Sequence, residues 1–483
     1  MLSAATATAS YDAPQQAPDP ASTPATHVAQ VTHFAPSPRE VAAWVRRFRR
    51  LHQRLERAEL RAELGAARAA MARIKRPARV AREALQGIRQ YGAAARRDTG
   101  VSRAAQLARL WWLRLRHHTT IESFYEYELF LPHRWAVAKT FAQWKEARLV
   151  YRLASVHSTM ATSETLADKR RFAEWCEREG IAAVPNLMHF EDGAVRGGDP
   201  DGADLPPATI FAKWAARFGG DGTLRLRFAD GAYLDSDGRR RSPREVVADL
   251  AERSREAPLV LQRCLTNHPD FAELAPNALS TVRVMTVQRP GRRPALLVAV
   301  LRLGMGGAMV DNWSTGGIAS PVDLRTGVIG TAVRTGEHLR PLRFDVHPDT
   351  GAPITGFRIP FWSQTVALAL RAHERLGHNP CVGWDIAVLP SGPVLLEGNW
   401  NAGVLLLQIP CGLGLLSTEF APAFCELLAH DVAALDDDAL RAWSRWEPVA
   451  VRGPRYQGPD LRSPAFGPNA GSQGSGGHRD RRG

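Results

Sequence analysis

Gly383-Trp384-Asp385-Ile386-Ala387-Val388 is followed shortly by Val394-Leu395-Leu396-Glu397-Gly398-Asn399, and these two segments are the most informative about the fold. A Pro-Ser-Gly-Pro turn at 390–393 separates them, so they predict a β-hairpin of strands 381–388 and 394–397. Asp385 lies on the first strand. Glu397 and Asn399 are two residues apart on the second, and side chains at that spacing face the same side. The hairpin therefore brings three oxygen-bearing side chains close together.

These three side chains are candidate metal ligands. Two carboxylates and a carboxamide suit Mg²⁺, a hard cation that also accepts phosphate oxygens and water as ligands. Without a cation, the carboxylates of Asp385 and Glu397 would repel each other and the pKa of one would rise. The alternative interpretation is a polar, hydrogen-bonded hairpin end without a metal.

Upstream, a lysine precedes a glycine-rich segment. Lys213 ends a predicted strand over 208–213, and Gly219-Gly220-Asp221-Gly222 follows before a second strand over 224–228. A lysine near backbone N–H groups freed by glycines is a common way to hold nucleotide phosphates. The alternative is an ordinary hairpin, because Gly-Asp-Gly also marks turns.

A third candidate is Arg283, which lies inside the otherwise apolar strand predicted over 280–287. A buried charge is costly unless it is paired. An arginine that contacts both a phosphate and Asp385 or Glu397 would be well paired. The alternative is an arginine at a strand edge that reaches solvent.

Strands and helices alternate between residues 157 and 435. Besides the strands above, we expect strands over 259–262 and 295–303. We also expect helices over 165–179, with Thr165 and Asp168 in a capping box, over 242–252 and over 361–376. Mixed antiparallel strands with helices on one side predict an α+β architecture.

In chain order, these elements resemble the ATP-grasp superfamily, and in particular the branch called sugar-transfer associated ATP-grasp. The resemblance covers about residues 160–420. It rests on Asn277-Ala-Leu-Ser-Thr-Val-Arg283, Val310-Asp-Asn312 with Gly316-Gly317, Gly383-Trp-Asp385 and Leu396-Glu-Gly-Asn399. It implies an ATP-grasp fold, in which two α+β subdomains clasp ATP.

The resemblance also implies roles for single residues. Lys169 and Lys213 would contact the ATP phosphates, and the turn with Gly219, Gly220 and Gly222 would close over them. The stretch Gln262, Arg263, Cys264 and Leu265 would be the hinge whose backbone reads the adenine edge. Asp385, Glu397 and Asn399 would bind Mg²⁺. Arg283 would act with Lys213 on the transferring phosphoryl group, and Asn312 with Gly316-Gly317 would line the acceptor side.

The activity implied by the resemblance is a carboxylate–amine ligase reaction. ATP converts a carboxylate to an acyl phosphate, which an amine or similar nucleophile then attacks. The implied partners are a small-molecule or sugar-linked carboxylate and an amine acceptor, in polysaccharide or glycoconjugate biosynthesis. Two alternatives stay open: an ATP-grasp phosphotransferase, and a non-catalytic ATP-binding adaptor that contacts a membrane or anionic polymer through residues 39–116.

The 483 residues carry a formal charge of +13, which is concentrated in one segment. Residues 39–116 hold 21 Lys and Arg against 6 Asp and Glu, so 21 − 6 = +15, and the remaining residues sum to 13 − 15 = −2. Ser37-Pro38-Arg39-Glu40 has the layout of a capping box, and an apolar stripe follows it, so the segment is predicted to be helical, with Gly65, Pro77 and Gly87 dividing it. It could contact an anionic membrane or polymer, or pack on the main domain with its charges in solvent. Specific nucleic-acid motifs are absent from it.

The predicted organisation is a disordered leader over 1–36, a basic helical region over 37–150, an ATP-grasp domain over 151–440 and a disordered tail over 451–483. Five scattered cysteines predict free thiols, and no sequence run is long and apolar enough for a membrane span. With no signal peptide, we expect a cytoplasmic protein, at most peripheral to a membrane. Trp111-Trp112, Phe124-Tyr125 and Tyr127 are expected to pack the basic helices against the main domain.

Overall fold

The computed structural model describes residues 36–157, 160–216, 223–306, 311, 313, 316–377 and 379–428. The tail predicted over 451–483 lies outside these residues, and so does the predicted leader except for its last residue. Gly219, Gly220, Gly222 and Asn312 also lie outside them.

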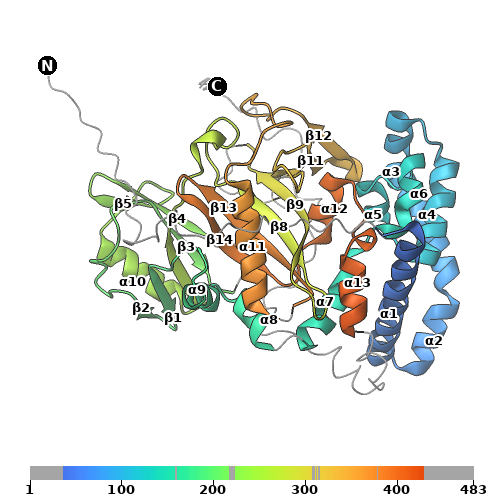
Figure 1. Ribbon diagram of the computed structural model, residues 1–483, viewed down its shortest axis with the longest axis horizontal. Helices are drawn as coiled ribbons and strands as arrows, with labels where there is room; N and C mark the ends of the chain where they lie inside the picture. Colours follow the sequence, from blue (N-terminus) through green and yellow to red (C-terminus); the bar gives the residue numbers. More distant parts are fainter. Residues whose placement is uncertain are drawn as a thin grey trace, which may run out of the picture.

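Two antiparallel sheets form the body of the molecule (Figure 1). The first has the strand order β2-β1-β7-β3-β4-β5-β6, and the second β12-β11-β10-β9-β8-β13-β14. The strands of the first are β1 (Met188–Glu191), β2 (Ala194–Gly197), β3 (Ile210–Trp214), β4 (Leu224–Ala229), β5 (Ala232–Leu234), β6 (Arg240–Arg241) and β7 (Leu259–Arg263). Those of the second are β8 (Thr281–Val287), β9 (Ala295–Leu303), β10 (Ile318–Pro321), β11 (Ala332–Thr335), β12 (Pro341–Phe344), β13 (Cys381–Leu389) and β14 (Gly392–Asn399).

Helices form one end of the molecule and also pack on both sheets. In Figure 1 the N-terminal helices lie at the end opposite the β1–β6 sheet, with the second sheet between them. The N-terminal helices are α1 (Pro38–Leu64), α2 (Ala66–Ile74), α3 (Arg76–Thr99), α4 (Arg103–His117), α5 (Ile121–Glu126), α6 (Pro132–Val137) and the 3₁₀ turn η2 (Ala138–Thr140). Further helices are α7 (Trp144–His157), α8 (Met160–Ala167), α9 (Lys169–Arg178), α10 (Pro243–Arg253), α11 (Trp362–Leu376), α12 (Val404–Cys411) and α13 (Phe420–Leu428). Short 3₁₀ turns are η3 (Pro269–Phe271), η5 (Glu337–Leu339) and η6 (Leu415–Ser417).

Local sequence signals explain most helix boundaries. α1 and α10 each begin at a complete capping box, Ser37 with Glu40 and Ser242 with Glu245. The predicted helix over 165–179 is wrong in one respect, because the helix is interrupted at Asp168, between α8 and α9. The Asp168 carboxylate accepts a hydrogen bond from the Arg170 N–H and so caps α9.

The predicted division at Gly87 is also wrong. Gly87 lies inside α3, and a side chain there would collide with Ile121, because an added Cβ would lie 2.6 Å from Ile121 Cγ2. The glycine thus serves close packing of α3 against α5 and does not end the helix.

α1 belongs to the same hydrophobic core as the second sheet. Val45, Phe48 and Leu55 are buried in the cluster that also contains the residues of β8, β9 and β13. The Phe48 ring lies 5.9 Å from the ring of Phe420 on α13. The apolar stripe predicted from the sequence is therefore the face with which α1 packs on the body.

α3, α4 and α5 pack through a second core. Phe124, Tyr125 and Tyr127 are fully or almost fully buried there, together with Val333 and Ile409 of the body. The expectation for Trp111 and Trp112 is wrong, since they are 44% and 42% exposed.

The predicted α+β fold class, with an N-terminal helical region ahead of the sheets, is confirmed. The five cysteines are free thiols, as expected. In the described part of the chain, no helix combines the length and the apolar character that a membrane span requires.

Candidate active site

The hairpin of β13 and β14 sets the geometry of the site. Asp385 pairs in register with Glu397 on one side and with Arg283 of β8 on the other. Residues directly opposite each other in an antiparallel sheet point to the same face. The three side chains therefore form a row across three strands, and Asn399, two residues beyond Glu397, shares their face.

Asp385 is the centre of a buried ion-pair cluster. Arg283 donates to both of its carboxylate oxygens, with Nη2 2.9 Å from Oδ2 and Nε bonded to Oδ1. Arg302 of β9 donates to Oδ2 from 3.1 Å. Burial alone would raise the pKa of Asp385, but the two guanidinium groups outweigh it and hold that pKa well below its usual range. Asp385 is a carboxylate at any physiological pH.

A second carboxylate balances the second arginine. Asp311 Oδ1 lies 3.5 Å from Arg302 Nη2, and Asp311 Oδ2 accepts hydrogen bonds from the backbone N–H and the hydroxyl of Thr281 at 2.7 and 2.5 Å. Arg302 Nε also donates to the Thr281 hydroxyl at 2.8 Å. Burial raises the pKa of Asp311, against the opposing effect of Arg302. The two arginines and two aspartates together form a nearly neutral cluster.

Sequence reasoning missed the part that Arg302 and Asp311 play in this cluster. Arg302 interrupts an apolar strand in the same way as Arg283 does, and this was the available signal. Thr281 and Asp385 lie on other strands, and Asp311 lies in the segment between β9 and β10. The register that joins Arg302 to Thr281 is visible only in the folded sheet.

Glu397 and Asn399 complete the predicted metal set at the open side of the cluster. Asn399 Nδ2 donates to Glu397 Oε1 at 3.3 Å, and Glu397 is half-buried. Among the described residues, no group of three or more His, Cys, Asp or Glu side chains is placed to hold a metal.

The donors nonetheless fit Mg²⁺ in part. Glu397 offers a carboxylate oxygen and Asn399 a carbonyl oxygen, whereas both Asp385 oxygens already accept from arginines. Magnesium sites commonly use one or two carboxylates and take their other ligands from substrate phosphates and water. Glu397 and Asn399 would therefore hold the cation, with Asp385 mainly orienting the arginines.

Two glycines allow this packing. An added Cβ at Gly383 would lie 2.7 Å from Ala402 Cβ and 3.3 Å from Arg283 Cδ. At Gly398 it would lie 2.6 Å from Leu166 Cδ2 and 2.9 Å from the Trp384 ring. The glycines of the two motifs are thus required by close approach on the hairpin.

The other sheet contributes the predicted lysine. Along β3, Ile210, Ala212 and Trp214 are buried in the core of that sheet, so Lys213 lies on the opposite face. Phe211 shares its face, and its ring lies 5.0 Å from Lys213 Nζ. Trp214, which follows the lysine, points into the core and away from this face.

Lys169, Lys213 and Glu397 are brought into one electrostatic site. Burial lowers the pKa of Lys169, and the nearby Glu397 carboxylate opposes this effect, followed by Asp168. Burial also lowers the pKa of Lys213, again opposed by Glu397, while Lys169 adds to the lowering. Glu397 of the second sheet thus interacts with both lysines, which come from α9 and from the first sheet.

The stretch predicted to be the adenine hinge, Gln262–Leu265, begins on β7, and its first residue is linked by hydrogen bonds to the start of α9. Gln262 of β7 is buried and lies opposite Phe211 of β3. Its Nε2 donates to Asn186 Oδ1 at 3.0 Å. Asn186 Nδ2 in turn donates to the carbonyl of Lys169 at 3.3 Å. The Cys264 N–H donates to Thr209 O at 2.9 Å, so an adenine contact from the Gln262–Leu265 stretch must use other backbone groups. Arg263 is exposed.

Comparison with known proteins identifies the family. The sequence model of the family described as "Sugar-transfer associated ATP-grasp" matches residues 151–421, which is more than half of the chain. No curated protein sequence matches the chain.

Solved structures with a similar arrangement include an L-amino acid ligase from Bacillus licheniformis, a D-alanine–D-alanine ligase from Bacillus anthracis and a biotin carboxylase from Campylobacter jejuni. Sequence identities are 10%, 12% and 10%, and TM-scores are 0.33, 0.32 and 0.35. The matches cover 59%, 61% and 62% of this chain, and 54%, 73% and 58% of those chains. The chain thus spans little more than half the length of the L-amino acid ligase.

Proposed function

Because the chain belongs to the sugar-transfer associated ATP-grasp family, we propose that it is an ATP- and Mg²⁺-dependent ligase that activates a carboxylate as an acyl phosphate. The observation that supports this best is the position of Glu397. It interacts with Lys169 and Lys213 on one side and with the Arg283–Asp385–Arg302 cluster on the other. ATP phosphates placed between the two sheets would meet cations from both.

In the proposed reaction, a carboxylate oxygen attacks the γ-phosphorus of ATP and the bond to the β-phosphate bridging oxygen breaks, which releases ADP. An amine then attacks the carbonyl carbon of the acyl phosphate and loses a proton, and inorganic phosphate leaves. Bound Mg²⁺ would neutralise the charge that builds up on the phosphate oxygens.

The protein residues position the reactants and balance charge. Lys169 and Lys213 would hold the phosphates from the first sheet. Arg283 would donate to the transferred phosphoryl group through Nη1, which makes no hydrogen bond to any described residue. Because Asp385 fixes both other donor positions of Arg283, this guanidinium is already oriented before the substrate binds.

The acceptor and setting belong to the same proposal. The family description points to glycan chemistry, so we propose a small-molecule or sugar-linked carboxylate and an amine acceptor in polysaccharide or glycoconjugate assembly in the cytoplasm. Asn312 and the Gly316-Gly317 pair would line the acceptor side.

The test is release of ADP and of inorganic phosphate by the purified full chain with Mg²⁺, ATP and pooled amino acids and sugar acids. A ligase releases both. A phosphotransferase releases ADP but keeps the phosphate on its product, and a binding-only adaptor releases neither. ATP at about a hundred times its dissociation constant should also stabilise the fold by ~2.7 kcal/mol, and absence of both stabilisation and turnover would overturn the proposal.

Glu397→Ala tests the site itself. We expect loss of turnover with an intact fold, because Glu397 is only half-buried. Glu273→Ala, which changes an exposed glutamate outside the site, is the matched control and should retain activity. Full activity of Glu397→Ala would exclude the proposed metal role.

A further inference from the structure

A cationic pocket lies among the N-terminal helices, outside the region that the family model matches. It is formed where α1 meets the end of α4 and the η2 turn, and its cavity volume is about 250 Å³. Its charged lining comes from Arg46, Arg49, Arg50, Arg116 and Lys139, with His117 beside them, and none of the described Asp or Glu residues lines it. Five cations around one small cavity repel one another unless an anion is present.

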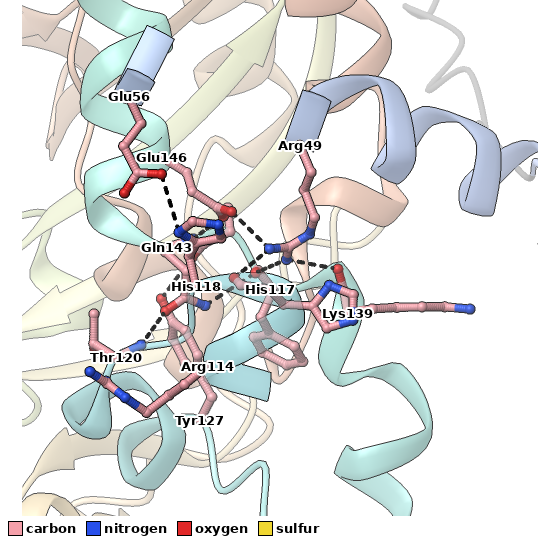
Figure 2. A network of polar contacts seen from close by, with 12 residues as sticks. Arg49, Glu56, Arg114, His117, His118, Thr120, Tyr127, Lys139, Gln143 and Glu146 are labelled. Carbon is pink, nitrogen blue, oxygen red and sulfur yellow. Dashed lines mark hydrogen bonds and ion pairs between the residues drawn. The ribbon is translucent and has the colours of Figure 1, made fainter. Parts of the chain in front are cut away.

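Arg49 holds the walls of the pocket together. It is only 6% exposed, and its Nη1 donates to the His117 carbonyl at 2.5 Å and to Glu146 Oε1 at 2.8 Å. Its Nη2 donates to the carbonyl of Lys139 at 3.1 Å. Figure 2 shows this arginine reaching from α1 toward His117 and Lys139, with the Lys139 side chain extending away from the network. Arg49 thus joins α1 to the end of α4 and to the η2 turn, the elements that carry the other cations.

The base offers hydrogen-bonding atoms that the fold does not use. Arg49 Nε and His117 Nδ1 are buried and have no hydrogen-bond partner among the described residues. Buried polar atoms are normally satisfied by protein, water or a ligand. Both atoms belong to residues that line the pocket, so its base is a strongly polar environment.

The potential at the base is positive. Burial, and then the charges of Arg49, His118, Lys139 and Arg116, lower the pKa of His117 to about 4. Two carboxylates that contact Arg49 or His118 are already engaged. Glu146 accepts from Arg49 and from the Gln143 N–H, and Glu56 lies 3.4 Å from His118.

The rim carries the excess charge. Arg46, Arg50, Arg116 and Lys139 are exposed, and none of them forms an ion pair with a described carboxylate. Other surface arginines of this chain do so, as Arg253 does with Asp249 at 2.9 Å. With Arg49 balanced by Glu146, the pocket retains four positive charges, which suits a multivalent anion with several oxygens.

We propose that this pocket binds a phosphate monoester or diphosphate group, carried by a soluble anion or by the headgroup of an anionic lipid. The exposed guanidinium groups of Arg46, Arg50 and Arg116 and the Lys139 ammonium would donate to the phosphate oxygens, and the buried Arg49 would hold the surrounding elements in place. The Trp112 ring, 4.9 Å from the His117 ring and 42% exposed, would lie beside the group that carries the phosphate. This site is separate from the proposed ATP site and does not depend on it.

The test uses Arg46→Gln/Arg116→Gln in the full chain, because both side chains are exposed and outside the Arg49 network. The matched control is Arg39→Gln/Arg68→Gln, which removes the same charge from exposed positions that do not line the pocket. One arm titrates inorganic pyrophosphate by calorimetry. The other measures sedimentation with phosphatidylcholine vesicles that contain phosphatidic acid or, at equal charge, phosphatidylserine.

Binding at least tenfold weaker in the pocket variant than in the control supports the proposal. Such loss with pyrophosphate indicates a soluble ligand, and loss with phosphatidic acid vesicles alone indicates a lipid headgroup. Equal losses in both variants would mean only general charge attraction and would overturn it, as would no binding in either arm. Lys213→Ala locates the site. If this change removes pyrophosphate binding and the pocket variant keeps it, the binding belongs to the ATP site, and this result also overturns the proposal.

Discussion

Asp385 shows how one buried carboxylate can hold two arginines in place. Asp385 is 2% exposed and lies between the Arg283 and Arg302 guanidinium groups. Asp385→Asn would leave these two buried cations with too little counter-charge, so we expect it to lower the free energy of unfolding by roughly 3–5 kcal/mol. Urea unfolding measures this loss, and Asp270→Asn, at an exposed position, is the control. A stable Asp385→Asn protein would mean that solvent or another carboxylate neutralises the arginines.

Glu126 is a buried acid outside the site, and it provides a pH-dependent prediction. Burial, and then Glu122, raise its pKa from 4.5 to about 7. The folded state therefore binds this proton more tightly than the unfolded state does. Stability falls as pH rises from about 4.5 to about 7, and the penalty is complete above that range.

Glu126→Gln should remove this penalty. We expect it to raise the free energy of unfolding above pH 7 by at most about 3 kcal/mol and to change little near pH 4.5. Glu122→Gln, at the neighbouring exposed position, should have a much smaller effect. A gain in stability that is the same at both pH values would show that the charge of Glu126 is not its cause.

At the scale of elements, a hydrogen-bonded chain ties α11 to the strand that carries Asp385. Trp384 Nε1 donates to the Thr286 hydroxyl at 2.8 Å, and that hydroxyl lies 2.7 Å from His373 Nδ1. His373 Nε2 lies 2.7 Å from the carbonyl of Asn379, which can only accept, so the proton is on Nε2 and Thr286 donates to Nδ1. A neutral His373 therefore satisfies the whole chain.

This chain predicts acid sensitivity. Burial lowers the pKa of His373 from 6.5 to about 4, so its contribution to stability is present above pH 6.5 and is lost as pH falls toward 4. His373→Gln should reduce the loss of unfolding free energy between pH 7 and pH 4 by at most about 3 kcal/mol, whereas His133→Gln, at an exposed position, should not. An unchanged pH dependence in His373→Gln would assign acid sensitivity to other groups.

Local signals predicted elements well and long-range partners poorly. The capping boxes at Ser37 and Ser242 and the β13–β14 hairpin follow from nearby residues, and the sequence predicts them. Arg302 joins the site only through strand register, and Asp311 joins it through tertiary contacts with Thr281 and Arg302. The sequence predicts one helix over 165–179 that begins at a cap formed by Thr165. In the structure a helix ends at Ala167, and Asp168, one turn after Thr165, caps the next helix, α9.

For the whole molecule, the question is whether the basic helices form a separate appendage. Phe48 of α1 is fully buried against Phe420 of α13, in the same core as the strands of the active site. Phe48→Ala should therefore lower the free energy of unfolding by roughly 3–5 kcal/mol. It should shift one unfolding transition to milder conditions, and the helical signal and the fluorescence of the body tryptophans should report the same transition. Leu64→Ala, at a 41% exposed position on the same helix, is the control and should cost far less. Loss of helical signal ahead of an unchanged body transition would instead define an independent N-terminal unit. If the transition is single, deletion of residues 1–116 exposes this core and damages the fold, so only point variants in the full chain can separate the phosphate pocket from the ligase site.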